Sequence, residues 1–113
     1  MSELEKTDML IKKLYDKILP LFPDEKMDVI LFGSYARGDY EEGSDIDVMF
    51  LVNTSRNEIA KKNWQIGNIA GDLLIEYGIL ISPIVENRKW FRNNANIIPL
   101  FKNILREGTY VNV

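Results

Sequence analysis

Apolar residues recur at helical spacing through the first part of the chain. They form a single stripe along one side of a predicted helix that runs from Leu4 to Phe22. The members of the stripe are Leu4, Ile11, Leu14, Tyr15, Ile18 and Phe22. Pro20 and Pro23 end the helix, because proline lacks an amide hydrogen and clashes with the preceding turn.

Two short apolar runs follow, and both predict strands. Residues 27–32 read Met-Asp-Val-Ile-Leu-Phe and stop at Gly33. Residues 46–52 are apolar at nearly every position, so neither face of this strand carries a polar pattern. We therefore expect the second strand to lie in the middle of its sheet.

The helical period returns after the second strand. Thr54 or Ser55 can cap a helix that extends to about Tyr77, and Glu58, three residues after Ser55, would complete a capping box. Gly78 ends this helix in the usual C-terminal role. Gly67 and Gly71 lie one turn apart on a flank of this helix, where another element could pack closely.

The last part of the chain alternates again between strand and helix. Residues 79–85 predict a third strand, and Pro83 within it favours an edge position or a bulge. Residues 99–107 predict a short helix, followed by a small strand over residues 109–113. This order predicts a single α+β domain over residues 1–113, a two-layer arrangement in which a small mixed β-sheet is flanked by helices.

Composition limits the chemistry that the chain can perform. The 113 residues include no cysteine and no histidine, which excludes disulfides, thiolate zinc sites and Ser-His-Asp catalysis. Carboxylates, hydroxyls and backbone amides remain, and these suit oxygen-liganded Mg²⁺. The net charge of −3 argues against a dedicated nucleic-acid binder. The chain has no membrane-length apolar run and no apolar core at its charged start, so we expect a cytoplasmic protein.

The stretch between the first two strands carries the candidate chemistry. Gly33 and Ser34 follow a strand and open a short turn or helix. Glycine allows the backbone to approach a ligand, and the amides that follow point at an anion as at any helix start. Asp45 and Asp47 are two residues apart, so on a strand both carboxylates face the same way, with Cβ atoms ~6.6 Å apart. Such a pair suits divalent cations, which relieve the repulsion between the carboxylates.

Each of these features has an ordinary structural explanation when taken alone. A Gly-Ser turn is usually only a turn, and an Asp-x-Asp pair is usually a solvated strand start. On adjacent strands, with Gly38, Gly43 and Ser44 between them, the two features together are much harder to explain structurally. We therefore interpret them as one site.

The same residues resemble a known signature. Gly33-Ser34-Tyr35-Ala36-Arg37-Gly38, followed by Ser44-Asp45-Ile46-Asp47, is similar to the Gly-Ser-x-Ala-Arg-Gly…Ser-Asp-Ile-Asp motif of the DNA polymerase β-like nucleotidyltransferase superfamily. The short chain resembles its minimal nucleotidyltransferases. The resemblance implies two sets of site residues: the nucleotide-binding Gly33, Ser34, Arg37 and Ser44, and the catalytic pair Asp45 and Asp47, which binds Mg²⁺ or Mn²⁺.

One position departs from the family pattern. Active members carry a third carboxylate on a following strand, whereas Ser82 is the polar residue of the strand predicted over residues 79–85. Glu86 lies four residues further on, roughly 13 Å away along a strand. Another carboxylate, from the acidic connection (Asp39, Glu41 and Glu42) or from a partner, could take the missing role.

The resemblance implies transfer of a nucleoside monophosphate from a nucleoside triphosphate, ATP being favoured, to a hydroxyl acceptor. The acceptors of such domains include proteins, among them HEPN-type partners in toxin–antitoxin pairs, and the short chain agrees with a protein partner. The alternative is a nucleotide-binding or antitoxin module with weak or no catalysis, which the serine at position 82 favours. The sequence leaves the acceptor, the base and the oligomeric state open.

Overall fold

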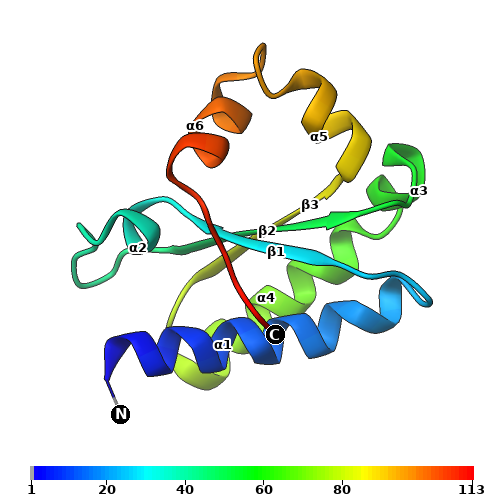
Figure 1. Cartoon of the computed structure of the whole chain (residues 1–113). Coiled ribbons are helices and arrows are strands. Elements are labelled where there is room, and N and C mark those ends of the chain that lie inside the picture. The colour runs from blue at the N-terminus through cyan, green and yellow to red at the C-terminus, as the bar shows by residue number, and fades with distance from the viewer. Residues whose placement is uncertain (1) are drawn as a thin grey trace.

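Helices cover both faces of a central sheet in the computed structural model, which describes residues 2–113. On one face lie α1 (Glu3–Ile18) and α4 (Asn63–Tyr77), and on the other lie α5 (Arg88–Asn94) and α6 (Pro99–Glu107) (Figure 1). The prediction of an α+β fold with a small mixed sheet flanked by helices is confirmed. The helices α5 and α6 add a third layer to the two that the pattern suggested.

The sheet has four strands in the order β3-β2-β1-β4. The strands are β1 (Asp28–Phe32), β2 (Ile46–Val52), β3 (Ile81–Asn87) and β4 (Thr109–Tyr110). β1 is antiparallel to β2 and to β4, whereas β2 and β3 are parallel. As predicted, β2 lies in the interior of the sheet, and β3, which contains Pro83, lies at an edge.

Strand β2 divides the interior into two cores. Val48 and Phe50 pack in the core beneath α1 and α4, whereas Met49 and Leu51 pack in the core that contains residues of α5 and α6. Because side chains alternate along a strand, Asp47 lies on the same face as Met49 and Leu51. The α5/α6 face therefore carries this carboxylate.

The first helix is shorter than predicted. α1 ends at Ile18 and is followed by a 3-10 turn over Leu19–Leu21, because Pro20 cannot continue the α-helical ladder. The buried stripe of α1 begins at Thr7, and Leu4 is exposed. Within residues 2–113, no helix is both long enough and apolar enough to cross a membrane.

The single helix predicted from Ser55 is two helices. Ser55 caps α3 (Arg56–Ala60) by accepting the amide hydrogen of Glu58, as the capping box predicts. The chain then breaks before α4, where the ammonium of Lys62 donates to the carbonyl oxygen of Leu21. This contact between residues distant in the sequence stabilises the turn between α3 and α4, and the local sequence pattern does not predict it.

The helix α5 has no counterpart in the sequence prediction. Asn87 caps it, since its side chain accepts the amide hydrogen of Trp90 at 2.9 Å. Only Phe91 and Ala95 face the core, which is too short a stripe to reveal a helical period. The two tryptophans are not core residues, since Trp90 is 37% exposed and Trp64 is 68% exposed.

Candidate nucleotide and metal site

The first element of the site is the turn from β1 into α2 (Ser34–Arg37). Gly33 caps this helix with φ 73° and ψ −155°, a conformation that is essentially restricted to glycine. The amides of Ala36 and Arg37 donate to the carbonyl oxygen of Gly33 at 3.1 and 3.0 Å. The preceding amides, those of Ser34 and Tyr35, come too early in the helix to have an acceptor within it. They are the donors that this turn offers to an anion.

The second element is the carboxylate of Asp47, which lies directly against Gly33. A Cβ atom added to Gly33 would overlap Oδ2 of Asp47. The register explains this proximity, because Phe32 pairs with Asp47 across β1 and β2. The sequence predicts that Gly33 allows a ligand to approach. The structure gives Gly33 a further role, because the absence of a side chain leaves room for the Asp47 carboxylate beside the turn.

The two aspartates act on each other electrostatically. Asp45 lies one residue before β2, and both side chains are half-buried. Burial, followed by repulsion from the charge of Asp45, raises the pKa of the Asp47 carboxyl above its ordinary range, and the guanidinium of Arg37 partly offsets this. A divalent cation between two such carboxylates would remove the penalty, and their hard oxygen atoms are the ligands that Mg²⁺ prefers.

Ser82 completes this part of the site. It pairs with Asp47 across the parallel strands β2 and β3 and lies on the same face of the sheet as Ile84, in the α5/α6 layer. The pairing of the two strands thus places Ser82 beside Asp47. Position 82, where the resemblance predicts a third carboxylate, therefore carries a hydroxyl group instead.

The other candidates for a third carboxylate lie elsewhere. Glu86 is only 7% exposed and pairs with Arg56 at 3.2 Å. Asp39 pairs with Arg37. Across residues 2–113, no three His, Cys, Asp or Glu side chains gather into a group that could hold a metal ion. The donor set offered by the chain is thus the aspartate pair.

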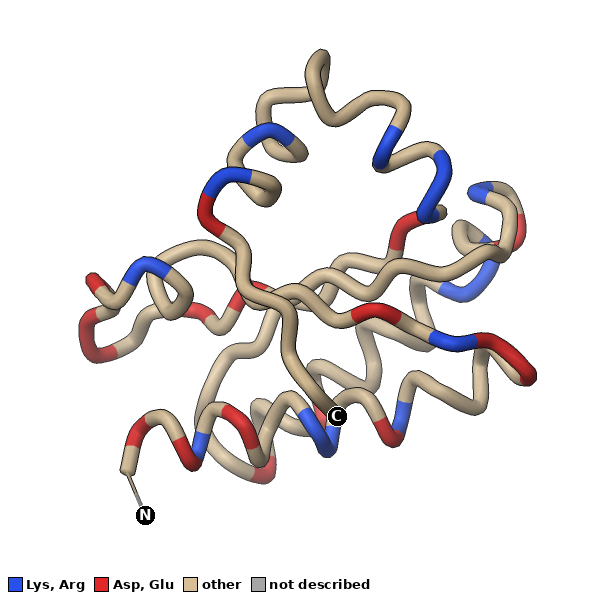
Figure 2. The backbone as a smooth tube through the Cα atoms, viewed as in Figure 1, with Lys and Arg blue, Asp and Glu red and all other residues tan. Residues whose placement is uncertain are grey.

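Arg37 and Ser44 have partners within the chain. Arg37 donates to Asp39 at 3.2 Å and to Glu107 at 2.9 Å, which ties α2 to the end of α6. The hydroxyl of Ser44 accepts the amide hydrogen of Glu41 at 2.9 Å and so closes the turn before Asp45. Their assignment to nucleotide binding remains a prediction, and their contacts show how they shape the connection between α2 and β2. Figure 2 shows acidic segments gathered along this connection.

Comparison with known proteins agrees with this geometry. A family model described as a nucleotidyltransferase domain matches residues 11–107. The chain belongs to this nucleotidyltransferase family.

Two curated relatives of this nucleotidyltransferase domain come from Methanocaldococcus jannaschii, and both bear the name "Putative protein adenylyltransferase". One, MJ0141, is 45% identical over 79 residues, which cover 70% of this chain and 78% of the relative. The other, MJ0604, is 38% identical over 80 residues, which cover 71% of this chain and 72% of the relative.

Solved structures share the fold of the domain. The crystal structure of a toxin–antitoxin with AMP-PNP has a TM-score of 0.58 at 22% identity, and the match covers 91% of this chain and 70% of that chain. A mutant of the toxin–antitoxin MntA-HpeT has a TM-score of 0.54 at 20% identity, covering 92% of this chain and 70% of that chain. At these identities the likeness establishes the fold.

A cleft that the sequence did not predict borders the domain's site. Its volume is about 630 Å³, and it lies between the start of α1, the end of α4 and the connection that precedes Asp45. Tyr35 and Tyr40 line it and stack on each other, with ring centroids 4.3 Å apart. Since α1 and α4 form its wall, the cleft opens on the sheet face opposite to Asp47. Residues distant in the sequence build it, so no local pattern could reveal it.

The electrostatics of Asp47 predict how stability depends on pH. In the metal-free domain, Asp47→Asn should raise the melting temperature at neutral pH, because the ionised carboxylate destabilises the folded state when its folded pKa is raised. The gain should shrink as the pH falls toward about 4, where the wild-type carboxyl also becomes neutral. Thermal unfolding in EDTA measures both effects. Asp39→Asn, which removes a carboxylate paired with Arg37, should give no such gain. A lower melting temperature for Asp47→Asn at neutral pH would contradict the assignment.

Proposed function

We propose that this domain transfers a nucleoside monophosphate, AMP from ATP, to a hydroxyl group on a partner protein. The observation that carries the proposal is the contact between the Asp47 carboxylate and Gly33, which joins a metal-binding group to a phosphate-binding turn. Membership of the nucleotidyltransferase family and the protein adenylyltransferase names of the relatives support the reaction and the kind of acceptor. ATP as donor favours a cytoplasmic site of action.

Each part of the site has a defined role in this proposal. The amides at the start of α2 and the hydroxyl of Ser34 bind the triphosphate oxygens. Asp45 and Asp47 would hold Mg²⁺ or Mn²⁺, which supplies charge neutralisation at the phosphates and a lower pKa for the attacking hydroxyl. Arg37, held by Glu107, keeps positive charge beside the aspartates. The net charge of −3 favours a protein acceptor over a nucleic acid.

Ser82 supports a second candidate function. A serine hydroxyl is a poor acceptor for the proton of an attacking hydroxyl, so the site binds a nucleotide better than it transfers one. The second candidate is therefore a nucleotide-binding antitoxin module with weak or no transferase activity. Structures with the same fold are described as toxin–antitoxin proteins, one of them with AMP-PNP. In both proposals we expect a HEPN-type protein as the partner.

Transfer of label from ATP to the partner tests the two candidates. The domain is incubated with the protein encoded beside it, with Mg²⁺ or Mn²⁺, and with ATP labelled at either the α- or the γ-phosphate. Covalent labelling of the partner by α-labelled ATP alone supports AMP transfer. Calorimetric binding of Mg²⁺–ATP without labelling supports the antitoxin module. Absence of both binding and transfer contradicts both candidates.

The aspartate pair should be required for binding. Asp45→Asn and Asp47→Asn should each weaken Mg²⁺-dependent binding of ATP roughly ten- to hundredfold, because each removes a charged ligand, and such contacts contribute about 1.5–3 kcal/mol. Asp8→Asn is the matched control, since Asp8 is an exposed aspartate on α1. It should bind as the wild type does. Unchanged affinity in both asparagine variants, measured by calorimetry, would remove the pair from the site.

A further inference from the structure

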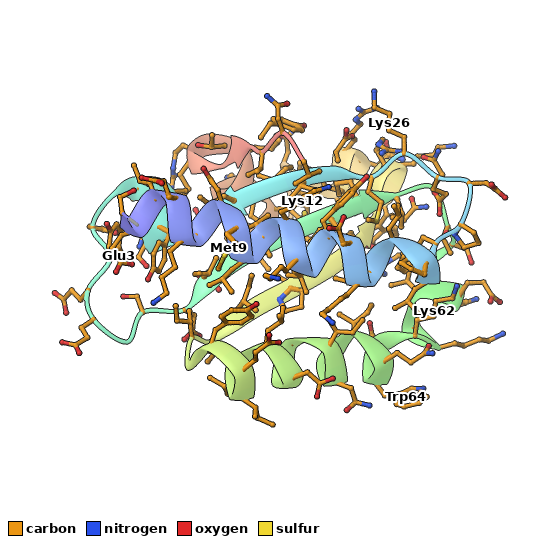
Figure 3. The ribbon with its side chains drawn as sticks, turned by 90° about the horizontal axis from the view of Figure 1, so that it is seen from below. Glu3, Met9, Lys12, Lys26, Lys62 and Trp64 are labelled. Atoms are coloured by element: carbon orange, nitrogen blue, oxygen red, sulfur yellow. The ribbon has the colours of Figure 1, made fainter. Side chains whose placement is uncertain are left out.

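The outward side of α4 carries an uncharged stripe. It consists of Trp64, Asn68, Gly71 and Ile75, which we name the α4 outer stripe. The buried residues of the helix, Ile66, Ala70 and Leu73, lie on the opposite side, against the sheet. In Figure 3, Trp64 extends away from α1, with which α4 forms an antiparallel pair.

Large apolar side chains of this stripe are in solvent. Trp64 is 68% and Ile75 is 86% exposed, although the outward face of a surface helix is normally polar. Gly71 and the neighbouring Gly67 have nothing within 4 Å of where a Cβ atom would stand. No segment of residues 2–113 therefore fills the space over the glycines between the two large side chains.

The spacing of the stripe is that of a helix–helix seam. Its members follow one another at intervals of four, three and four residues, the alternation that keeps one side of a helix against a partner helix. Gly71 at the middle lets a second backbone approach closely, and Asn68 is the kind of polar seam residue that fixes register. The sequence of the stripe is therefore typical of one helix of a packed helix pair.

We propose that the α4 outer stripe packs against the same stripe of a second copy of this chain, with the two helices antiparallel about a two-fold axis. The order of intervals, four-three-four, reads the same in both directions. In an antiparallel pair, Trp64 therefore lies opposite Ile75 of the second copy, and Asn68 lies opposite Gly71. Such self-complementarity is what a two-fold interface requires.

The charges at the ends of the helix favour the antiparallel orientation. Lys61 stands just before α4, where its ammonium pairs with Glu58 of α3 at 2.9 Å and its side chain stays 71% exposed. Glu76 is exposed in the last turn of the helix. An antiparallel pair brings Lys61 of each copy toward Glu76 of the other, whereas a parallel pair would bring like charges together. Charge thus selects between the two ways in which the stripes could meet.

The dimer leaves both nucleotidyltransferase sites open. Asp47 and Ser82 lie on the α5/α6 face of the sheet, whereas α4 covers the other face. The inference goes beyond the proposed function and can fail without it. A contact limited to one helix per copy lies at the small end of protein interfaces, so we expect affinity in the micromolar range.

Analytical ultracentrifugation of the full chain tests the dimer. Between about 5 and about 500 µM, where a micromolar affinity spans the transition, the mass should rise from 13.1 kDa toward twice that value. Ile75→Glu should remain monomeric over the same range, because it places a charge in the seam. It is expected to fold, since Ile75 is almost fully exposed. The matched control is Ile97→Glu, since Ile97 is 73% exposed outside α4; it should dimerise as the wild type does.

A charge exchange tests the orientation. Lys61→Glu should weaken the dimer about three- to tenfold, and the double variant Lys61→Glu with Glu76→Lys should restore it, because two exposed ion pairs contribute about 0.2–1 kcal/mol each. A wild-type monomer at all concentrations, or a dimer that Ile75→Glu leaves intact, overturns the proposal. Failure of the double variant to restore the dimer overturns the antiparallel arrangement. Calorimetric affinity for Mg²⁺–ATP should be equal in wild type and Ile75→Glu, which separates this inference from the proposed function.

Discussion

Replacing Gly33 with valine is expected to abolish Mg²⁺-dependent ATP binding and to lower stability. Two separate effects combine at this position. The backbone conformation, φ 73° and ψ −155°, costs a residue other than glycine about 1–3 kcal/mol. In addition, the new Cβ atom would overlap the carboxylate of Asp47, so either the turn or the Asp47 side chain must move.

Calorimetry and thermal unfolding of the same samples separate the two effects. Gly67→Val is the matched control, because Gly67 lies in a regular helix with open space over its Cα atom. It should remain folded and bind ATP normally. A folded Gly33→Val protein with wild-type affinity would show that the turn does not bind the phosphates.

Replacing Ser82 with aspartate is expected to produce the largest gain in transfer. Ser82 pairs with Asp47 on the same face of the sheet, so the new carboxylate would stand beside the aspartate that we propose as a metal ligand. It would supply a third oxygen ligand and a base for the attacking hydroxyl, and general-base catalysis typically contributes ~10²–10⁴ in rate. We expect faster labelling of the partner protein by ATP.

The gain should depend on divalent metal. Without metal, a third carboxylate adds repulsion to a site where burial and Asp45 already raise the pKa of Asp47, so the melting temperature should fall. Ser82→Asn is the matched control, because asparagine has nearly the same shape as aspartate but no charge. It should give no gain in rate. Fast transfer by the wild type that survives removal of each acid of the connection, Asp39, Glu41 and Glu42, and of Glu86 would show that two aspartates suffice. No gain in a folded, metal-loaded Ser82→Asp protein would remove position 82 from the catalytic site.

The sequence by itself determined the elements that depend on local patterns. Strand β2 was predicted with its observed bounds, because a short run that is apolar at nearly every position is typical of an interior strand. Pro83, which cannot donate to a neighbouring strand, predicted an edge position or a bulge for β3, and the structure has β3 at an edge. The motif from Gly33 to Asp47 could likewise be recognised in the sequence, because the glycines of the turn and the two-residue spacing of the aspartates are local features.

The tertiary structure decided what depends on contacts between distant residues. The approach of Asp47 to Gly33 follows from the register of β1 and β2, which hydrogen bonds and core packing set together. The tie from Arg37 to Glu107 joins residues 70 positions apart. Helix α5 exists because Phe91 and Ala95 fit a core that β1, β2 and α6 complete, and its own two-residue stripe is too weak a signal. The exposure of Trp64 and Ile75 could likewise be known only from the structure, because the spacing of apolar residues along a helix does not reveal which of its sides other elements cover.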